Sequence, residues 1–159
     1  MALTGAQDDA SRLVETYSPM LLRLACTRLE TPADAEDVVQ EVFLKLLTAR
    51  PAFRDEEHEK AWLIRTTLHR AADLRKAAAR RNVPLEDALL AAAPEPENQL
   101  LAVVRALPEK YGAVIHLHYY EGYSLKEIGK LLGLPAATVG TRLARGRERL
   151  RQSLKEEIE

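Results

Sequence analysis

The sequence lacks the residues and runs that build disulfide frameworks or membrane spans. Its 159 residues include a single cysteine, Cys26, which excludes an internal disulfide and any metal site made of cysteines alone. No stretch approaches the roughly 18 apolar residues that a membrane span requires. The acidic segment 1–10 also differs from a secretory signal, which begins with a basic region and continues with an apolar one. We therefore expect a soluble, cytoplasmic protein without membrane insertion.

Aromatic and β-branched residues are also scarce, whereas alanine, leucine, glutamate and arginine are abundant. Aromatics make up only 5% of the chain, and the abundant residue types favour helix by intrinsic propensity. Proline and glycine occur at widely spaced positions that divide the chain into about seven helical segments. The sequence therefore predicts an all-α fold.

An excess of one charge is absent from the chain as a whole, which carries 23 basic and 24 acidic residues. The charges are nevertheless segregated. Residues 1–90 carry 13 basic and 15 acidic side chains, residues 91–100 carry two acidic ones, and residues 101–159 carry 10 basic and 7 acidic ones. The last segment is thus net positive, and most of its cations fall between Arg142 and Lys155. A basic helix of this kind is typical of a nucleic-acid contact.

A proline-rich segment separates two parts of the chain. Residues 82–98 hold three of the eight prolines and end in an Ala/Pro/Glu stretch without an apolar stripe. This composition is typical of a flexible linker between domains. We expect two small helical domains, 1–81 and 99–159, joined by the linker 82–98.

The second domain contains the pattern of a helix-turn-helix. Ser124 and Glu127 form a capping-box pattern at the start of an apolar-faced helix. Gly133 stands where a helix ends in a left-handed residue, and Pro135 stands where the next helix begins. Two helices joined by so tight a turn predict a DNA-reading unit.

The second helix of this unit separates its apolar and polar residues. At about 100° per residue, Val139, Leu143, Leu150 and Leu154 share one arc. A different arc carries hydroxyl and guanidinium groups, which bond bases or phosphates. The predicted duplex-binding residues are Thr138, Thr141, Arg142, Arg145 and Arg149.

The first domain carries two unusual helical faces. A predicted helix over 33–49 has a core-facing stripe from Ala35 to Leu47, and its opposite side combines acids with a leucine. That side, Asp37, Gln40, Glu41 and Leu44, is either a partner surface or a solvated face with one stray leucine.

A second predicted helix, 59–81, aligns the only tryptophan with polar residues: Trp62, Arg65, Thr66, His69, Asp73, Lys76 and Arg80. Trp62 either stacks unpaired bases or packs between helices. A polar loop predicted over Phe53–Glu59 could hold a flipped base.

Three segments resemble the extracytoplasmic-function (ECF) sigma factors of the sigma-70 family, which are promoter-recognition subunits of bacterial RNA polymerase. DAEDVVQEVFLKLL (34–47) resembles the polymerase-binding helix, and AWLIRTTLHRAADLRK (61–76) resembles the helix for the minus-ten promoter element. Residues 107–150 resemble the fourth region of the family. The order and spacing of the three segments also match the family.

The resemblance implies a role for each face. Asp37, Gln40, Glu41 and Leu44 would meet the clamp helices of the largest polymerase subunit. The melted minus-ten strand would contact Trp62, Arg65, His69 and Asp73, with the loop from Phe53 capturing a flipped base. Duplex DNA at the minus-thirty-five element would meet Thr138, Thr141, Arg142, Arg145 and Arg149. Many family members are also held by an anti-sigma protein, which makes such a protein a candidate partner.

Some positions depart from the family pattern. His69 stands where many members have asparagine, and Gly112 stands where arginine is usual. Gly140 and Ala144 replace larger contacting side chains. We therefore carry over the roles of the faces and leave the promoter sequence open.

Three other classes of function compete with a sigma factor. An enzyme is disfavoured, because His116 and His118 do not share a helical face and the chain has no glycine-rich phosphate loop; we expect no catalysis, metal or cofactor. A stand-alone helix-turn-helix regulator would bind a two-fold symmetric duplex without polymerase. A sigma-like protein could also dock on polymerase without melting DNA.

Overall fold

The structure is a computed structural model that describes residues 2–80 and 96–158. Within those ranges every regular element is a helix, which confirms the all-α prediction. None of the described helices is long and apolar enough to cross a membrane. Most of the predicted linker lies outside the described residues, and a helix already begins at Pro96.

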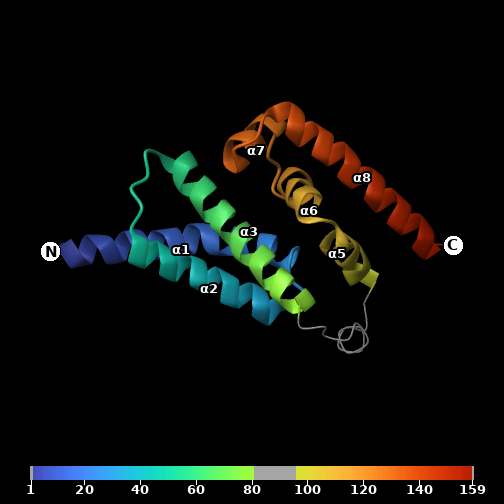
Figure 1. The fold of residues 1–159 in the computed structure, drawn as a ribbon. Coiled ribbons are helices and arrows are strands. Elements are labelled where there is room, and N and C mark those ends of the chain that lie inside the picture. The colour runs from blue at the N-terminus through green and yellow to red at the C-terminus, as the bar shows by residue number, and fades with distance from the viewer. Residues whose placement is uncertain (1, 81–95, 159) are drawn as a thin grey trace.

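The first unit contains three long helices: α1 (Ala2–Cys26), α2 (Pro32–Ala49) and α3 (Glu56–Arg80) (Figure 1). The Thr31 hydroxyl caps α2 by accepting a hydrogen bond from the Asp34 amide at 3.1 Å. The predicted stripe of α2 is buried from Ala35 to Leu46 against the other two helices. Leu47, predicted to belong to that stripe, is 49% exposed, because Leu46 is the last side chain of α2 that enters the core.

The second unit contains four α-helices and one π-helical turn: α5 (Pro96–Ala106), α6 (Glu109–Ile115), η1 (His116–Tyr120), α7 (Leu125–Leu132) and α8 (Ala136–Ile158). Its core forms where α8 packs along α6 and α7. Gly146 permits a close approach there, because a Cβ at this position would lie 3.0 Å from Ile115 Cγ1.

The two units are in direct contact along α3 and α7 (Figure 1). Their buried apolar side chains form one contiguous cluster, which includes Leu21 and Leu24 of the first unit and Leu107 and Val114 of the second. The described chain is therefore closed, with its two units packed on each other.

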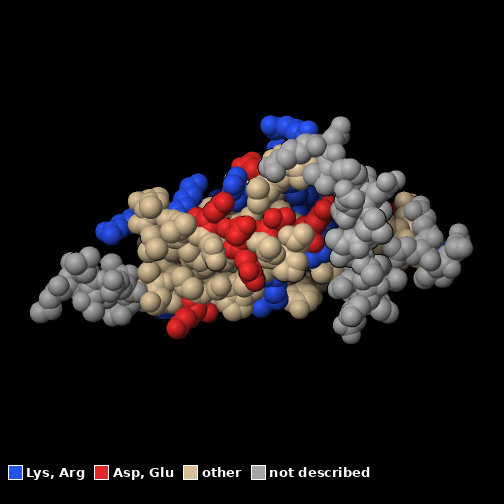
Figure 2. All heavy atoms as spheres, turned by 90° about the horizontal axis from the view of Figure 1, so that it is seen from below, with Lys and Arg blue, Asp and Glu red and all other residues tan. Residues whose placement is uncertain are grey.

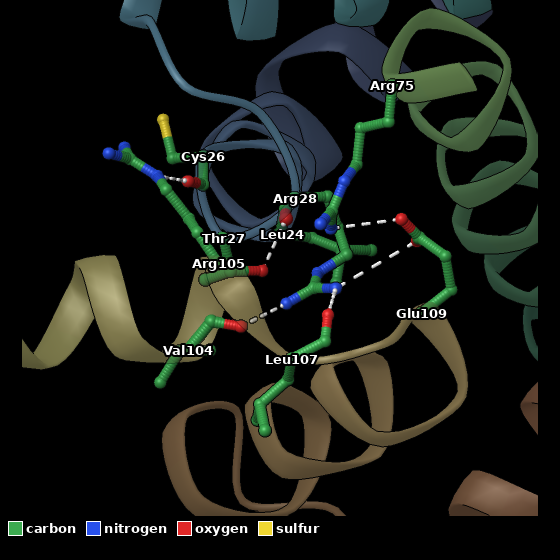
Figure 3. A network of polar contacts seen from close by, with 9 residues as sticks. All are labelled: Leu24, Cys26, Thr27, Arg28, Arg75, Val104, Arg105, Leu107 and Glu109. Carbon is green, nitrogen blue, oxygen red and sulfur yellow. Dashed lines mark hydrogen bonds and ion pairs between the residues drawn. The ribbon is translucent and has the colours of Figure 1, made fainter. Parts of the chain in front are cut away.

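Arg28 joins the units from the turn that follows α1 (Figure 3). Its side chain is fully buried and donates to the carbonyl oxygens of Val104 (2.6 Å) and Leu107 (3.1 Å), at the end of α5. Among the described residues the nearest carboxylate is that of Glu109, 3.9 Å from Arg28 Nη1, and Arg75 also pairs with it at 3.0 Å. Burial lowers the pKa of Arg28 to about 10, so the group is still charged at neutral pH.

Two other arginines repeat this arrangement at helix ends. Arg105 Nε donates to the Cys26 carbonyl at the end of α1 (2.6 Å), and Arg65 Nε donates to the Leu131 carbonyl near the end of α7 (2.6 Å). The last carbonyls of a helix have no partner within that helix and carry its negative dipole end. Each of the three arginines therefore satisfies a helix end that belongs to the opposite unit.

A charge cluster also crosses the contact, with the side chains of Glu121 and His116 buried and that of Arg23 exposed. Arg23 donates to both carboxylate oxygens of Glu121, at 2.7 and 3.0 Å. Glu121 lies 2.8 Å from His116 Nε2, and the His116 ring is stacked on Tyr120. Burial lowers the pKa of His116 although Glu121 opposes this effect. The folded chain therefore holds this imidazole neutral more strongly than the unfolded chain does.

We expect His116→Gln to flatten the pH dependence of stability below about pH 6.5. Because the pKa of His116 is lowered in the folded chain, the unfolded chain binds a proton at this histidine below the ordinary pKa near 6.5, whereas the folded chain does not yet bind it. In the wild type, the free energy of unfolding should therefore fall as the pH decreases, by up to about 1.4 kcal/mol per pH unit. Urea unfolding across this range measures the slope, and an equal slope in the variant would contradict the assignment to His116.

Candidate nucleic-acid and partner interfaces

The helix-turn-helix forms as the sequence predicts. Ser124 Oγ accepts from the Glu127 amide, and the Glu127 carboxylate accepts from the Ser124 amide, both at 3.1 Å. α7 ends at Gly133, which has a φ of 70° in the left-handed region. Both the capping box and the glycine at the turn are thus confirmed.

Gly129 is a further requirement of this turn that the motif alone did not identify. A Cβ at Gly129 would lie 2.6 Å from the Leu134 carbonyl oxygen. The Gly129 carbonyl also accepts from the Leu134 amide at 2.8 Å, so the backbone folds tightly over this residue. A glycine inside a helical pattern indicates such an approach, and this signal could have found it.

The predicted duplex-binding face of α8 is largely accessible. Val139 and Leu143 are buried against the domain, so α8 turns its other side outward. Thr141, Arg145 and Arg149 are exposed, and Thr138 and Arg142 are half-buried. Arg149 also lies 5.0 Å from the centre of the Tyr111 ring, so part of its cation is engaged within the domain.

The predicted minus-ten face of α3 lines a pocket of about 550 Å³. Trp62, Arg65 and His69 contribute to its wall, whereas Asp73 lies one turn further along α3, exposed and outside it. Phe53 packs against Trp62 with their ring centres 6.0 Å apart. Trp62 is therefore half-buried, with one contact in the protein and one side on the pocket.

The polar loop predicted over Phe53–Glu59 is shorter than expected, because α3 already begins at Glu56. Asp55 Oδ1 accepts from the His58 amide at 2.7 Å, and three acids in the first turn favour the positive end of the helix. The segment that precedes α3 is thus confined to residues 50–55. The other residues assigned to the loop form the first turn of α3.

Arg65 has partners that the sequence did not indicate. Besides its bond to Leu131, its Nη2 donates to the Lys130 carbonyl at 3.1 Å. Lys130 itself is part of the pocket wall. In this closed arrangement the end of α7 therefore lies over one edge of the predicted minus-ten face.

The predicted partner face of α2 is fully accessible. Asp37, Gln40, Glu41 and Leu44 are exposed, and Leu44 is 60% exposed. Glu41 pairs with Arg70 of α3. Seen from the side on which α2 lies, acidic side chains gather across the middle of the molecule (Figure 2). This face thus combines negative charge with an apolar residue.

Comparisons with known proteins place both units in one family. The family model described as Sigma-70 region 2 matches residues 13–81, and the model described as Sigma-70, region 4 matches residues 97–150. The chain belongs to the ECF RNA polymerase sigma factors of this family.

Several curated relatives are similar over most of their length. ECF sigma factor SigW of Bacillus subtilis is 29% identical, with 96% of this chain and 92% of the relative covered. SigM of Mycobacterium tuberculosis is 32% identical, with 90% and 76% covered. The sigma factor RpoE from Bartonella quintana, solved in complex with the anti-sigma factor NepR, has the same fold: the TM-score is 0.68 at 21% identity, with 92% of this chain and 97% of that chain covered.

We expect Ser124→Ala to lower the free energy of unfolding by about 1 kcal/mol, because it removes the hydroxyl that caps α7. Ser124→Thr is the matched control, since it keeps a hydroxyl at the same position. Urea unfolding of both variants measures the difference. If the alanine and threonine variants were equally stable, the hydroxyl would contribute nothing to the cap.

Proposed function

We propose that this sigma factor divides promoter recognition among three faces. Polymerase binds the α2 face, the melted minus-ten strand runs along α3, and the minus-thirty-five duplex lies on α8. The residues assigned to each are Asp37, Gln40, Glu41 and Leu44; Phe53, Trp62, Arg65, His69 and Asp73; and Thr138, Thr141, Arg142, Arg145 and Arg149. The domain limits proposed for this division are 1–81 and 99–159.

The exposed α2 face carries this proposal, because a helix-turn-helix alone would serve any duplex-binding regulator. Leu44 is 60% exposed on this face, and it stands among acids and an amide. An exposed apolar residue with surrounding charge fits a protein partner that has apolar and basic groups. The clamp helices of the polymerase core are that proposed partner.

Chemical complementarity supports the two DNA faces. Trp62 and its pocket offer a ring for stacking and space for an unpaired base. Thr141 and Arg145 offer a hydroxyl and a guanidinium to base edges and phosphates. A chain of net charge −1 should bind DNA weakly on its own, so we assign most of its promoter affinity to the complex with polymerase.

We also propose that the protein acts in the cytoplasm and catalyses no reaction itself. An anti-sigma protein is a further proposed partner. The support is the family resemblance and the similar fold of the Bartonella sigma factor, which was solved with such a protein.

Reconstitution with bacterial core polymerase tests the function as a whole. We expect transcription of genomic DNA from discrete start sites that core polymerase alone does not use. The start sites should share two upstream sequence elements, which sequencing of the transcript ends would identify. Transcripts indistinguishable from those of core polymerase alone would refute the proposed function.

Leu44→Asp should weaken binding to core polymerase by about 2 kcal/mol, or roughly thirtyfold in Kd, because the interface loses an apolar anchor and gains a charge. Val14→Asp is the matched control, since it places the same charge on an exposed apolar position of α1. Fluorescence titration of labelled core polymerase measures both Kd values. If both variants lost the same affinity for core polymerase, the assignment of polymerase binding to the α2 face would be contradicted.

Arg145→Ala should lower promoter use and leave the Kd for core polymerase unchanged. The loss of one base-contacting arginine costs about 1–3 kcal/mol of discrimination. Arg151→Ala is the control, because Arg151 lies off the proposed DNA-facing arc and pairs with Glu148 at 3.4 Å. Transcription from the reconstituted start sites measures both effects, and a parallel loss of polymerase binding by Arg145→Ala would contradict the division of labour.

A further inference from the structure

Arg70 binds one acid of the α2 face in the isolated chain. It lies on α3 and donates through Nε to Glu41 Oε2 and through Nη2 to Glu41 Oε1 (3.3 Å), so each carboxylate oxygen accepts one hydrogen bond. The side chains of Arg70 and Glu41 are 40% and 45% exposed, which leaves the pair within reach of a partner protein. Among the described residues Glu41 has no other ion pair. Arg70 therefore sets how much negative charge Glu41 presents to solvent.

The pair stabilises the free chain by a small amount. Asp37 and Glu41 stand four residues apart on α2, where side chains are neighbours and like charges repel each other. A cation at Glu41 offsets this repulsion. Because exposed ion pairs change an equilibrium constant by up to about fivefold, the contribution of Arg70 to folding is modest but measurable.

The same pair opposes a basic partner. A partner cation that approaches the Glu41 carboxylate meets the positive charge of Arg70 at the same two oxygens. Like charges brought together across an interface cost affinity. The partner either displaces Arg70 or shares the carboxylate with it, since a carboxylate can accept more than two hydrogen bonds. In both cases the interaction that stabilises the free chain weakens the complex.

Arg70 lies outside the proposed minus-ten face of α3. At about 100° per residue it stands about 60° from Asp73, beyond the edge of the arc that also holds Trp62, Arg65 and His69. The residues that line the pocket beside Trp62 do not include Arg70. A substitution at Arg70 should therefore change the charge of the α2 face and leave the minus-ten residues in place.

We propose that Arg70 is a positioning residue that competes with core polymerase for Glu41. In the free chain Arg70 holds the carboxylate by two hydrogen bonds, and polymerase binding weakens or replaces them. The inference rests on the proposed function, because it takes α2 as the face that polymerase binds. It adds a residue of α3, outside that face, that lowers the affinity for polymerase.

Arg70→Gln tests the competition in the full-length chain. The variant should bind core polymerase about two- to fivefold more tightly than the wild type, because Glu41 is then free for the partner. Arg70→Lys keeps the charge but loses the planar fork that reaches both oxygens, so its Kd should lie between the other two. Fluorescence titration of labelled core polymerase measures the three Kd values. Weaker or unchanged binding by Arg70→Gln would overturn the proposal.

A double-mutant cycle assigns the gain in affinity to this pair. Glu41→Gln should itself weaken polymerase binding, and the addition of Arg70→Gln should then change the Kd no further. Lys76→Gln is the matched control, since it removes the same charge from an exposed position of α3, about 9 Å further along the helix. It should leave the Kd unchanged. An equal gain from Arg70→Gln in the Glu41→Gln background, or from Lys76→Gln, would show a general effect of charge and refute the competition.

The gain in affinity should also depend on salt, because it is electrostatic in origin. The Debye length falls from about 10 Å at 0.1 M salt to about 3 Å at 1 M. The ratio of the wild-type Kd to the Arg70→Gln Kd should therefore be largest at low salt and approach one near 1 M. A ratio that stayed constant would indicate an altered packing of α2 on α3 and contradict the proposal.

Urea unfolding of the free chains tests the pair without polymerase. Arg70→Gln should lower the folding equilibrium constant by up to about fivefold, and it should not do so in the Glu41→Gln background. A residue with only a structural role would lower stability without raising the affinity for polymerase. Equal losses of stability in both backgrounds would refute the pair. If neither Glu41→Gln nor Leu44→Asp weakened polymerase binding, the proposed polymerase face itself would be wrong, and the competition with it.

Discussion

The structure depends on how arginines satisfy the ends of helices across the contact between its two units. Arg28, Arg65 and Arg105 each donate to carbonyls at the end of a helix in the opposite unit. These carbonyls carry the negative end of a helix dipole and would otherwise require water. The contact is therefore directional, since the guanidinium planes fix where each helix end must lie. The buried apolar side chains also stabilise the contact between the units, but they do not determine where the helix ends lie.

The faces of the molecule differ in chemistry because their charges are kept apart. Acids and Leu44 occupy the outer side of α2, whereas the cations of the second unit gather on α8. A net charge near zero thus conceals one surface suited to a protein and another suited to DNA. The two surfaces lie on different units. A change in how the units are arranged therefore leaves each surface intact, and it alters only whether both surfaces are accessible at the same time.

Local patterns predicted much of the fold and the site, because they depend on neighbouring residues. The capping box at Ser124, the left-handed Gly133 and the exposed Leu44 each follow from residue spacing within a single helix, α7 for the first two and α2 for Leu44. The end of the loop before α3 was misplaced, because Asp55 caps the helix earlier than the periodic apolar residues indicate. The partners of Arg65 and Arg28 were not predictable, since they are backbone carbonyls at least 65 and 76 residues away, respectively, and carry no sequence signature.

Gly112 lies so close to the buried Arg28 guanidinium that a Cβ at position 112 would be 2.0 Å from Arg28 Nη2, and this contact has an evolutionary consequence. Every amino acid other than glycine at this position carries a Cβ that overlaps the guanidinium, so most codon changes there abolish the fit. To regain it, a lineage would have to restore one particular residue while Arg28 is still present. Positions 28 and 112 are therefore coupled: the residue at one of them limits which residues the other can accommodate.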